Sequence, residues 1–151
     1  MLLKEVGEDK SLQRAFLQFP VDLYRSDSNW IRPLDTDVES IFDPKKNPHF
    51  KNGGAIRWVL SDDTGQVIGR VAAFYEQSNE EVPVGGMGFF ECIEDKEAAY
   101  MLFDACKAWL KEHGMEGMDG PINFGERDSF WGLMVKGWEY EPTYKMPWTK
   151  A

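Results

Sequence analysis

The sequence has only two cysteines, Cys92 and Cys106, among its 151 residues. Two cysteines are too few for a disulfide framework, so we expect reduced packing residues in an intracellular protein. No apolar run approaches the roughly 18 residues that a membrane-spanning helix needs. The start of the chain also lacks the apolar core of a signal peptide. These absences predict a cytoplasmic protein without a membrane partner.

Basic residues are scarce as well. The chain carries 17 Lys and Arg against 26 Asp and Glu, a formal net charge of -9. An acidic surface without a Lys/Arg cluster repels phosphate backbones, so no nucleic-acid partner is expected. No cysteine or carboxylate near His49 or His113 shows metal-ligand spacing, so no metal site is predicted. The surplus of acid either keeps the protein soluble or attracts a cationic amine substrate.

Large apolar side chains are abundant, since 42% of the residues are hydrophobic and 14% are aromatic. This composition suffices for a real core, and no repeat, linker or low-complexity tract divides the chain. We therefore expect a single domain over residues 1–151. The larger aromatic residues either fill that core or line a pocket; they are Trp30, Phe42, Phe89, Phe90, Trp131 and Trp138.

The first half of the chain predicts an edge strand, a helical region and a hairpin. Asp9 stands where an N-cap belongs, and the apolar residues after it recur at helical spacing. Pro20 interrupts this pattern, so the helix should stop or kink near Phe19. The sequence Asp-Asp-Thr-Gly at 62–65 is typical of a tight hairpin turn. The expected elements are a strand at 2–6, helical pieces at about 10–18 and 20–25, a helix at about 37–42 capped by Asp35 or Asp37, and strands at 55–61 and 66–75.

The second half predicts one more strand of an antiparallel meander and then a helical crossover. Asp95 caps the clearest helix of the chain, and Gly114 follows its end. The strand after this crossover should run parallel to the one before it. The expected elements are strands at 86–93 and 117–124, helices at 96–113 and about 128–136, and hence the order β-α-α-β-β-β-α-β-α in a mixed α/β sheet.

That order is similar to the GNAT superfamily of N-acetyltransferases. In that fold, acyl-CoA lies where two neighbouring parallel strands splay apart, against the start of the helix between them. The resemblance places this gap between strands 86–93 and 117–124. Local strings also resemble a bacterial GNAT-like family that has no settled activity and whose members are usually longer. These strings lie at 19–20, 23–24, 29–34, 42–48, 69–73, 88–91 and 120–121.

The resemblance implies two catalytic candidates. Glu91 ends the cofactor strand, where some GNAT enzymes hold a glutamate that takes a proton from the amine. Aromatic neighbours would raise its pKa, while the alternative is a strand-end glutamate that faces water or pairs with Arg70. Many GNAT enzymes also have a tyrosine that protonates the leaving thiolate, but Leu133 occupies that position here. Tyr140 and Tyr144 lie downstream as substitutes or as packing or surface residues, and Tyr140 is our candidate acid.

The loop before the cofactor helix departs from the GNAT pattern. Active members have glycines there, which let backbone N–H groups approach the pyrophosphate. Residues 92–99 contain no glycine and place three carboxylates, on Glu94, Asp95 and Glu97, around the single Lys96. Such carboxylates oppose diphosphate binding. The resemblance implies that acetyl-CoA or another acyl-CoA would contact Gly88, Phe89, Phe90, Cys92, Ile93, Lys96 and Asn123.

The sequence predicts an acyl-CoA-dependent N-acyltransferase that acts on a small-molecule amine. Two alternatives stay open, a catalytically silent GNAT-like module that binds a small molecule or a protein, and the N-terminal half of a longer two-domain protein. Only 14 residues follow Gly137, too few for the two strands that end a complete GNAT fold. We therefore expect a homodimer or a further C-terminal domain to cover the sheet edge.

Overall fold

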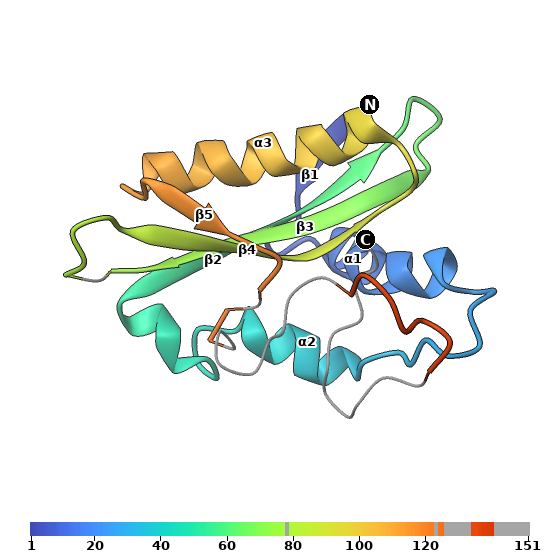
Figure 1. Ribbon diagram of the computed structural model, residues 1–151, viewed down its shortest axis with the longest axis horizontal. Coiled ribbons are helices and arrows are strands. Elements are labelled where there is room, and N and C mark those ends of the chain that lie inside the picture. The colour runs from blue at the N-terminus through green and yellow to red at the C-terminus, as the bar shows by residue number, and fades with distance from the viewer. Residues whose placement is uncertain (78, 123, 126–133, 141–151) are drawn as a thin grey trace.

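In this computed structural model, the described residues are 1–151 apart from 78, 123, 126–133 and 141–151, and they form a five-stranded sheet with helices on both faces (Figure 1). Strands β1 to β4 are antiparallel neighbours in sequence order, and β5 lies parallel to β4. Helix α3 covers one face of the sheet, and α1 and α2 lie on the other (Figure 1). The elements are β1 (Leu2–Glu5), α1 (Lys10–Leu23), α2 (Asp35–Ile41), the 3-10 helix η1 (Pro48–Lys51), β2 (Gly53–Ser61), β3 (Val67–Glu76), β4 (Val84–Cys92), α3 (Lys96–Glu112) and β5 (Gly117–Asp119).

This arrangement confirms the predicted fold class and the parallel pairing after the crossover. The helix expected at about 128–136 falls mainly outside the described residues. Residues 134–136 are described and are not helical, and Met134 forms an isolated bridge. That end of the expected helix was therefore wrong. Among the described residues, no helix is both long and apolar enough to span a membrane.

Helix α1 runs through Pro20 as a single helix, so the expected stop near Phe19 and the two separate pieces at 10–18 and 20–25 were wrong. A proline has no N–H group, and the carbonyl of the residue four positions earlier therefore loses its helical donor. That carbonyl belongs to Phe16, and Nη1 of Arg70 donates to it at 2.8 Å. The helix continues because a side chain from β3 replaces the missing backbone donor. At its start, Asp9 accepts from two backbone amides as predicted.

Helix α2 begins at Asp35, two residues earlier than expected, and Leu34 is its N-cap without a side-chain bond. Asp35 instead forms an ion pair with Arg32 at 2.9 Å, so neither expected aspartate caps the helix. The predicted hairpin turn is confirmed. The carboxylate of Asp62 accepts from the amide of Thr64 at 2.9 Å, and Gly65 adopts a φ of 87°. Only glycine takes that backbone conformation without strain.

Strand β5 ends at Asp119 rather than near residue 124. The next peptide, Gly120-Pro121, is cis, and Pro121 has no N–H to donate to a sheet ladder. Beyond it, Ile122 still donates to the carbonyl of Met87 at 2.8 Å. The parallel pair β4–β5 is therefore short, and β4 extends past it toward Glu91.

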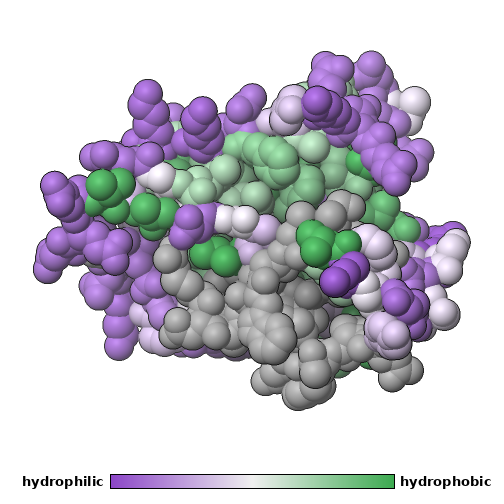
Figure 2. Space-filling model, in the orientation of Figure 1, coloured by the Kyte–Doolittle hydropathy of each residue, from purple (hydrophilic) through white to green (hydrophobic). Residues whose placement is uncertain are grey.

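The two faces of the sheet bury different kinds of side chain. Under α3, one apolar cluster joins Leu102, Cys106 and Leu110 to Val71 and Ala73 of β3. Figure 2 shows hydrophilic side chains along the outer side of α3, as expected for an amphipathic helix. A second apolar cluster, centred on Phe16 of α1, lies on the opposite face. The buried polar residues bond to α1, to α2 or to Tyr24, the C-cap of α1; they are Asn47, Arg57, Arg70 and Glu91.

Candidate functional site

A β-bulge interrupts β4 just before its end. Ala72 of β3 faces Gly88, whereas Arg70 faces Glu91, so β4 holds one more residue than β3 over this stretch. Phe89 lies at the bulge with a φ of 52°, in the left-handed region that non-glycine residues seldom adopt. The backbone of β4 is therefore bent where the GNAT resemblance places the acyl donor.

The bulge decides which face Glu91 occupies. In a regular strand, side chains four residues apart point to the same face, so Glu91 would join Met87 under α3. Phe90 does pack there, with its ring centroid 4.7 Å from that of Phe103. The extra residue reverses the alternation, and the Glu91 carboxylate meets Tyr24 on the face that α1 covers.

Glu91 is a buried carboxyl group between a hydroxyl and a cation. Its side chain is only 7% exposed. The hydroxyl of Tyr24 donates to Oε2 of Glu91, and Arg70 lies opposite Glu91 in the ladder. Burial raises the pKa of Glu91 to about 7, while the charge of Arg70 and the bond from Tyr24 hold it down. A carboxyl group with such a pKa exchanges its proton at neutral pH, as a general base must.

Arg70 is itself enclosed. It is 6% exposed, its guanidinium carbon lies 4.7 Å from the Phe16 ring centroid, and its Nε has no hydrogen-bond partner among the described residues. Burial lowers the pKa of Arg70 to about 10, and the Glu91 carboxylate opposes that shift. Arg70 therefore remains a cation at neutral pH, held by Phe16 rather than by a direct ion pair with Glu91.

A cavity of about 940 Å³ opens beside Glu91, between the end of α1 and the start of α3. Its apolar wall suits an acyl arm, and its hydroxyl groups suit a polar acceptor. Carboxylates outnumber cations on the wall. The lining residues are Leu23, Tyr24, Ser26, Asp27, Ser28, Phe90, Glu91, Cys92, Ile93, Glu94, Asp95, Lys96 and Ala99.

Most of the residues predicted from the sequence meet at this cavity. Phe90, Cys92, Ile93 and Lys96 line it together with Glu91. Other predicted contacts do not: Gly88 and Phe89 lie on β4 without lining the cavity, and Asn123 falls outside the described residues. Tyr140 is 70% exposed and is not among the described lining residues. The role of each remains a prediction.

The start of α3 is already satisfied by its own cap. The carboxylate of Asp95 accepts from the amides of Glu97 at 2.8 Å and Ala98 at 3.1 Å. Its carbonyl accepts from the amide of Ala99 at 3.0 Å. These are the donors that a diphosphate at a helix start would need. The diphosphate of an acyl-CoA therefore does not fit at the start of α3 unless the Asp95 side chain turns away from these amides. The cavity itself fits the acyl-pantetheine arm.

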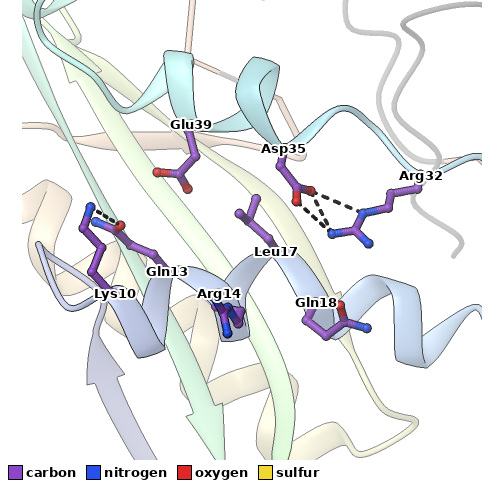
Figure 3. Close-up of a pocket in the computed structure, with 8 residues that line it drawn as sticks. All are labelled: Lys10, Gln13, Arg14, Leu17, Gln18, Arg32, Asp35 and Glu39. Atoms are coloured by element: carbon purple, nitrogen blue, oxygen red, sulfur yellow. Dashed lines mark hydrogen bonds and ion pairs between the residues drawn. The ribbon is translucent and has the colours of Figure 1, made fainter.

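A second, smaller hollow of about 330 Å³ lies between α1 and α2 (Figure 3). Arg32 points to Asp35 on the α2 side of the hollow, and Lys10 points to Gln13 on the α1 side, so these polar groups bond to their own neighbours. Glu39 bonds to Arg57 at 2.6 Å. No buried acid or base enters this hollow from the described residues, and we do not assign the chemistry to it. The described residues also hold no group of three or more side chains placed to bind a metal.

Local sequence patterns do not predict the contact between Tyr24 and Glu91. They offer Arg70 only as an alternative partner of Glu91. Tyr24 lies 67 residues from Glu91, so no local pattern connects them. The one local signal was Pro20 inside a helical pattern, which marks a free carbonyl that some distant donor has to satisfy.

No family model matches the chain. Protein YghO of Escherichia coli strain K12 is 31% identical over 148 residues, which cover 92% of this chain and 36% of that protein. A bacterial ceramide synthase of Caulobacter vibrioides is 31% identical over 137 residues, which cover 88% of this chain and 35% of that protein. The chain thus spans about a third of the length of these curated relatives.

Solved acetyltransferases share the arrangement at low sequence identity. An acetyltransferase of Trypanosoma brucei matches with a TM-score of 0.56 at 12% identity, over 90% of this chain and 96% of that one. AAC(6')-Iy in complex with the bisubstrate analogue CoA-S-monomethyl-acetylneamine matches with a TM-score of 0.53 at 14% identity, over 85% and 83% of the two chains. By element order and by likeness to these acetyltransferases, the chain has a GNAT-like fold.

Proposed function

We propose that this chain is an N-acyltransferase domain that moves an acyl group from acyl-CoA to a small-molecule amine, with Glu91 as general base. The observation that carries the proposal is a buried carboxyl group with a pKa of about 7 on the wall of a large cavity. The GNAT-like fold supports acyl transfer as the reaction class. A surface carboxylate would be too weak a base at neutral pH to assist an amine.

The chemistry is a direct transfer. The amine nitrogen attacks the thioester carbonyl carbon, a C–N bond forms and the C–S bond breaks. Glu91 takes the proton that the nitrogen gives up, and the leaving thiolate takes up a proton to become the CoA thiol. We assign that second proton to Tyr140, which is 70% exposed and has to approach the cavity when substrate binds. The products are an amide and free CoA.

We propose that the acyl donor and the amine contact different lining residues of the cavity. We assign the acyl and pantetheine parts of the donor to the apolar side formed by Phe90, Cys92 and Ile93, next to the bulged backbone of 88–89. Lys96 and Asn123 are the proposed polar contacts to the donor. The acceptor amine is a cation in water, and the carboxylates that line the cavity favour its approach to Glu91. It gives up one proton to water before the neutral nitrogen attacks.

The relative named bacterial ceramide synthase favours a lipid-like acceptor. A ceramide is an N-acylated long-chain amino alcohol, so its formation is an amide-forming acyl transfer of the proposed kind. Hydroxyls on Ser26 and Ser28 and the apolar side chain of Leu23 line the same cavity and suit such an amphiphile. We therefore propose a long-chain amino alcohol as the first acceptor to test.

The test is to incubate the chain with acetyl-CoA or palmitoyl-CoA and either a long-chain amino alcohol or a short primary amine. Amide formation is followed by mass spectrometry, and CoA release by a thiol reagent. In parallel, the melting temperature is followed against CoA concentration, because a ligand that binds the folded state raises it. Amide formed in step with free thiol supports the proposal. Absence of both amide and thermal shift at millimolar CoA contradicts it.

A second candidate function is a GNAT-like module that binds ligands without catalysis. The observation that favours it is the capped start of α3, where Asp95 holds the amides of Glu97 and Ala98. Such a module would bind an amine in the acidic cavity and would not respond to CoA. Calorimetric titration with acetyl-CoA separates the two candidates, because both bind the amine but only the enzyme also binds the thioester.

The long relatives favour a larger assembly. Among the described strands, β5 has three residues and pairs with β4 alone. We propose that a further domain or a second copy covers this edge, as unpaired strand edges invite pairing. Light scattering of the chain tests the second copy, and a monodisperse monomer would contradict it.

A further inference from the structure

The proline within α1 has a partner on the sheet. Pro20 leaves the Phe16 carbonyl without a helical donor, and Nη1 of Arg70 takes the vacant place at 2.8 Å. This bond is buried and joins positions 54 residues apart. An alanine at position 20 would offer its own N–H to the same carbonyl. With proline at position 20, the Phe16 carbonyl is left to accept a hydrogen bond from Arg70.

This hydrogen bond fixes Arg70 beside Glu91. Arg70 faces Glu91 across the β3–β4 ladder, on the same side of the sheet. Its guanidinium also lies against the rings of Phe16 at 4.7 Å and Phe89 at 5.8 Å. Phe89 is the residue with positive φ at the bulge. Arg70 is thus held between α1 and the bulge that aims Glu91.

The end of the same helix holds the other side of the carboxylate. Tyr24 is the C-cap of α1, and its backbone N–H donates to the Pro20 carbonyl at 2.9 Å. Its hydroxyl donates to Oε2 of Glu91. The Tyr24 ring also packs against the Trp30 ring at a tilt of 31°, with ring centroids 5.5 Å apart. Helix α1 therefore acts on the carboxylate in two ways: Tyr24 bonds to it directly, and the Phe16 carbonyl holds the charge of Arg70 opposite it.

We propose that α1 is the positioning element of the site: Pro20 frees the Phe16 carbonyl to fix the charge of Arg70 opposite Glu91, and Tyr24 orients the Glu91 carboxylate. The three are positioning residues, and Glu91 is the group that would meet the substrate. This inference rests on the proposed function for its purpose, but the contacts it describes exist without substrate.

Other charged groups share the neighbourhood of Glu91. Besides burial, the groups that shift the pKa of Glu91 are Arg70 and Tyr24. Arg57 is a second buried arginine on the same face, and it pairs with Glu39 at 2.6 Å instead. The remaining ionisable groups among the described lining residues of the cavity are Asp27, Cys92, Glu94, Asp95 and Lys96.

The test is to titrate the Glu91 carboxyl carbon by NMR in the unliganded chain, with Glu91→Gln used for assignment. The variants are Arg70→Met, Tyr24→Phe and Pro20→Ala, and Arg57→Met is the matched control. Arg70→Met should raise the midpoint by about 1 to 3 pH units, the usual effect of a nearby opposite charge. Tyr24→Phe and Pro20→Ala should raise it by less, and Arg57→Met should leave it unchanged.

A midpoint that stays at the wild-type value in both Arg70→Met and Tyr24→Phe overturns the proposal. Equal shifts in Arg57→Met and Arg70→Met also overturn it, because the effect would then belong to any buried arginine. If Arg70→Met does not fold by circular dichroism, the conservative Tyr24→Phe and the Pro20→Ala variant still decide. The titration needs no acyl transfer, so absent activity with shifted midpoints would reject the proposed function and keep the positioning element.

Discussion

The two faces of the sheet differ in what they bury. The face under α3 buries an apolar cluster around Leu102, and α3 is a regular helix with a capped start. The face under α1 buries Arg57, Arg70 and Glu91, and its helix contains a proline. Buried charges cost free energy unless they are well partnered, whereas apolar packing supplies most of the stability of a domain. The α3 face thus stabilises the fold, and the α1 face keeps charged groups where acyl transfer would use them.

The largest expected effect falls on the α1 face. Glu91→Gln removes the proposed base and should lower the rate of acyl transfer about 10²- to 10⁴-fold, the usual contribution of a general base. The matched control is Glu112→Gln, an exposed acid at the far end of α3 that does not line the cavity. Steady-state kinetics should show nearly wild-type turnover for the control. Unchanged turnover in Glu91→Gln removes Glu91 from the mechanism.

On the α3 face the expected loss is stability instead. Leu102 is completely buried, so Leu102→Ala should lower the free energy of unfolding by about 2 to 5 kcal/mol. Urea unfolding measures the loss. The titration midpoint of Glu91 should not move, because the two clusters lie on opposite faces of the sheet. A shifted midpoint in this variant would mean that the two faces are coupled.

Stability should depend on pH through Glu91. The folded-state pKa of about 7 lies above the ordinary value of 4.5. The folded chain then binds the proton more tightly than the unfolded chain, so this stability is present below pH 4.5 and is lost as the pH rises through about 7. The loss is at most about 3 kcal/mol. Urea unfolding between pH 4 and 8 should show it in the wild type and not in Glu91→Gln, and parallel curves for the two proteins would contradict it.

The smallest expected effect on stability comes from removing the N-cap of a helix, and it differs in its consequences between α3 and α1. Asp95→Ala removes the cap of α3 and should cost about 1 kcal/mol. It also frees the amides of Glu97 and Ala98 and removes a negative charge, so CoA should bind more tightly. Asp9→Ala removes the equivalent cap of α1 and is the matched control. Calorimetry should show tighter CoA binding in the first variant alone, and weaker binding there would place the diphosphate on an intact Asp95 cap.

The α3 face could be predicted from the sequence and the α1 face only in part. The hairpin turn, the caps at Asp9 and Asp95 and the apolar stripe of α3 depend on neighbours in the chain, which local patterns record. The site depends on contacts 54 and 67 residues apart and on a bulge of one residue. The local pattern predicts a stop or kink at Pro20 because its compensating donor, Arg70, comes from a distant strand. The family resemblance alone predicts Glu91 as the base. The burial of Glu91 and its partners are known only from the three-dimensional structure.

The most direct test of the account is a crystal structure of the chain with a CoA–amine bisubstrate analogue. The account predicts that the pantetheine lies in the cavity past the bulge of β4, with the acceptor nitrogen within hydrogen-bonding distance of the Glu91 carboxylate. An analogue bound in the hollow between α1 and α2, or bound with its nitrogen away from Glu91, would contradict the assignment of acyl transfer to Glu91 and the cavity beside it.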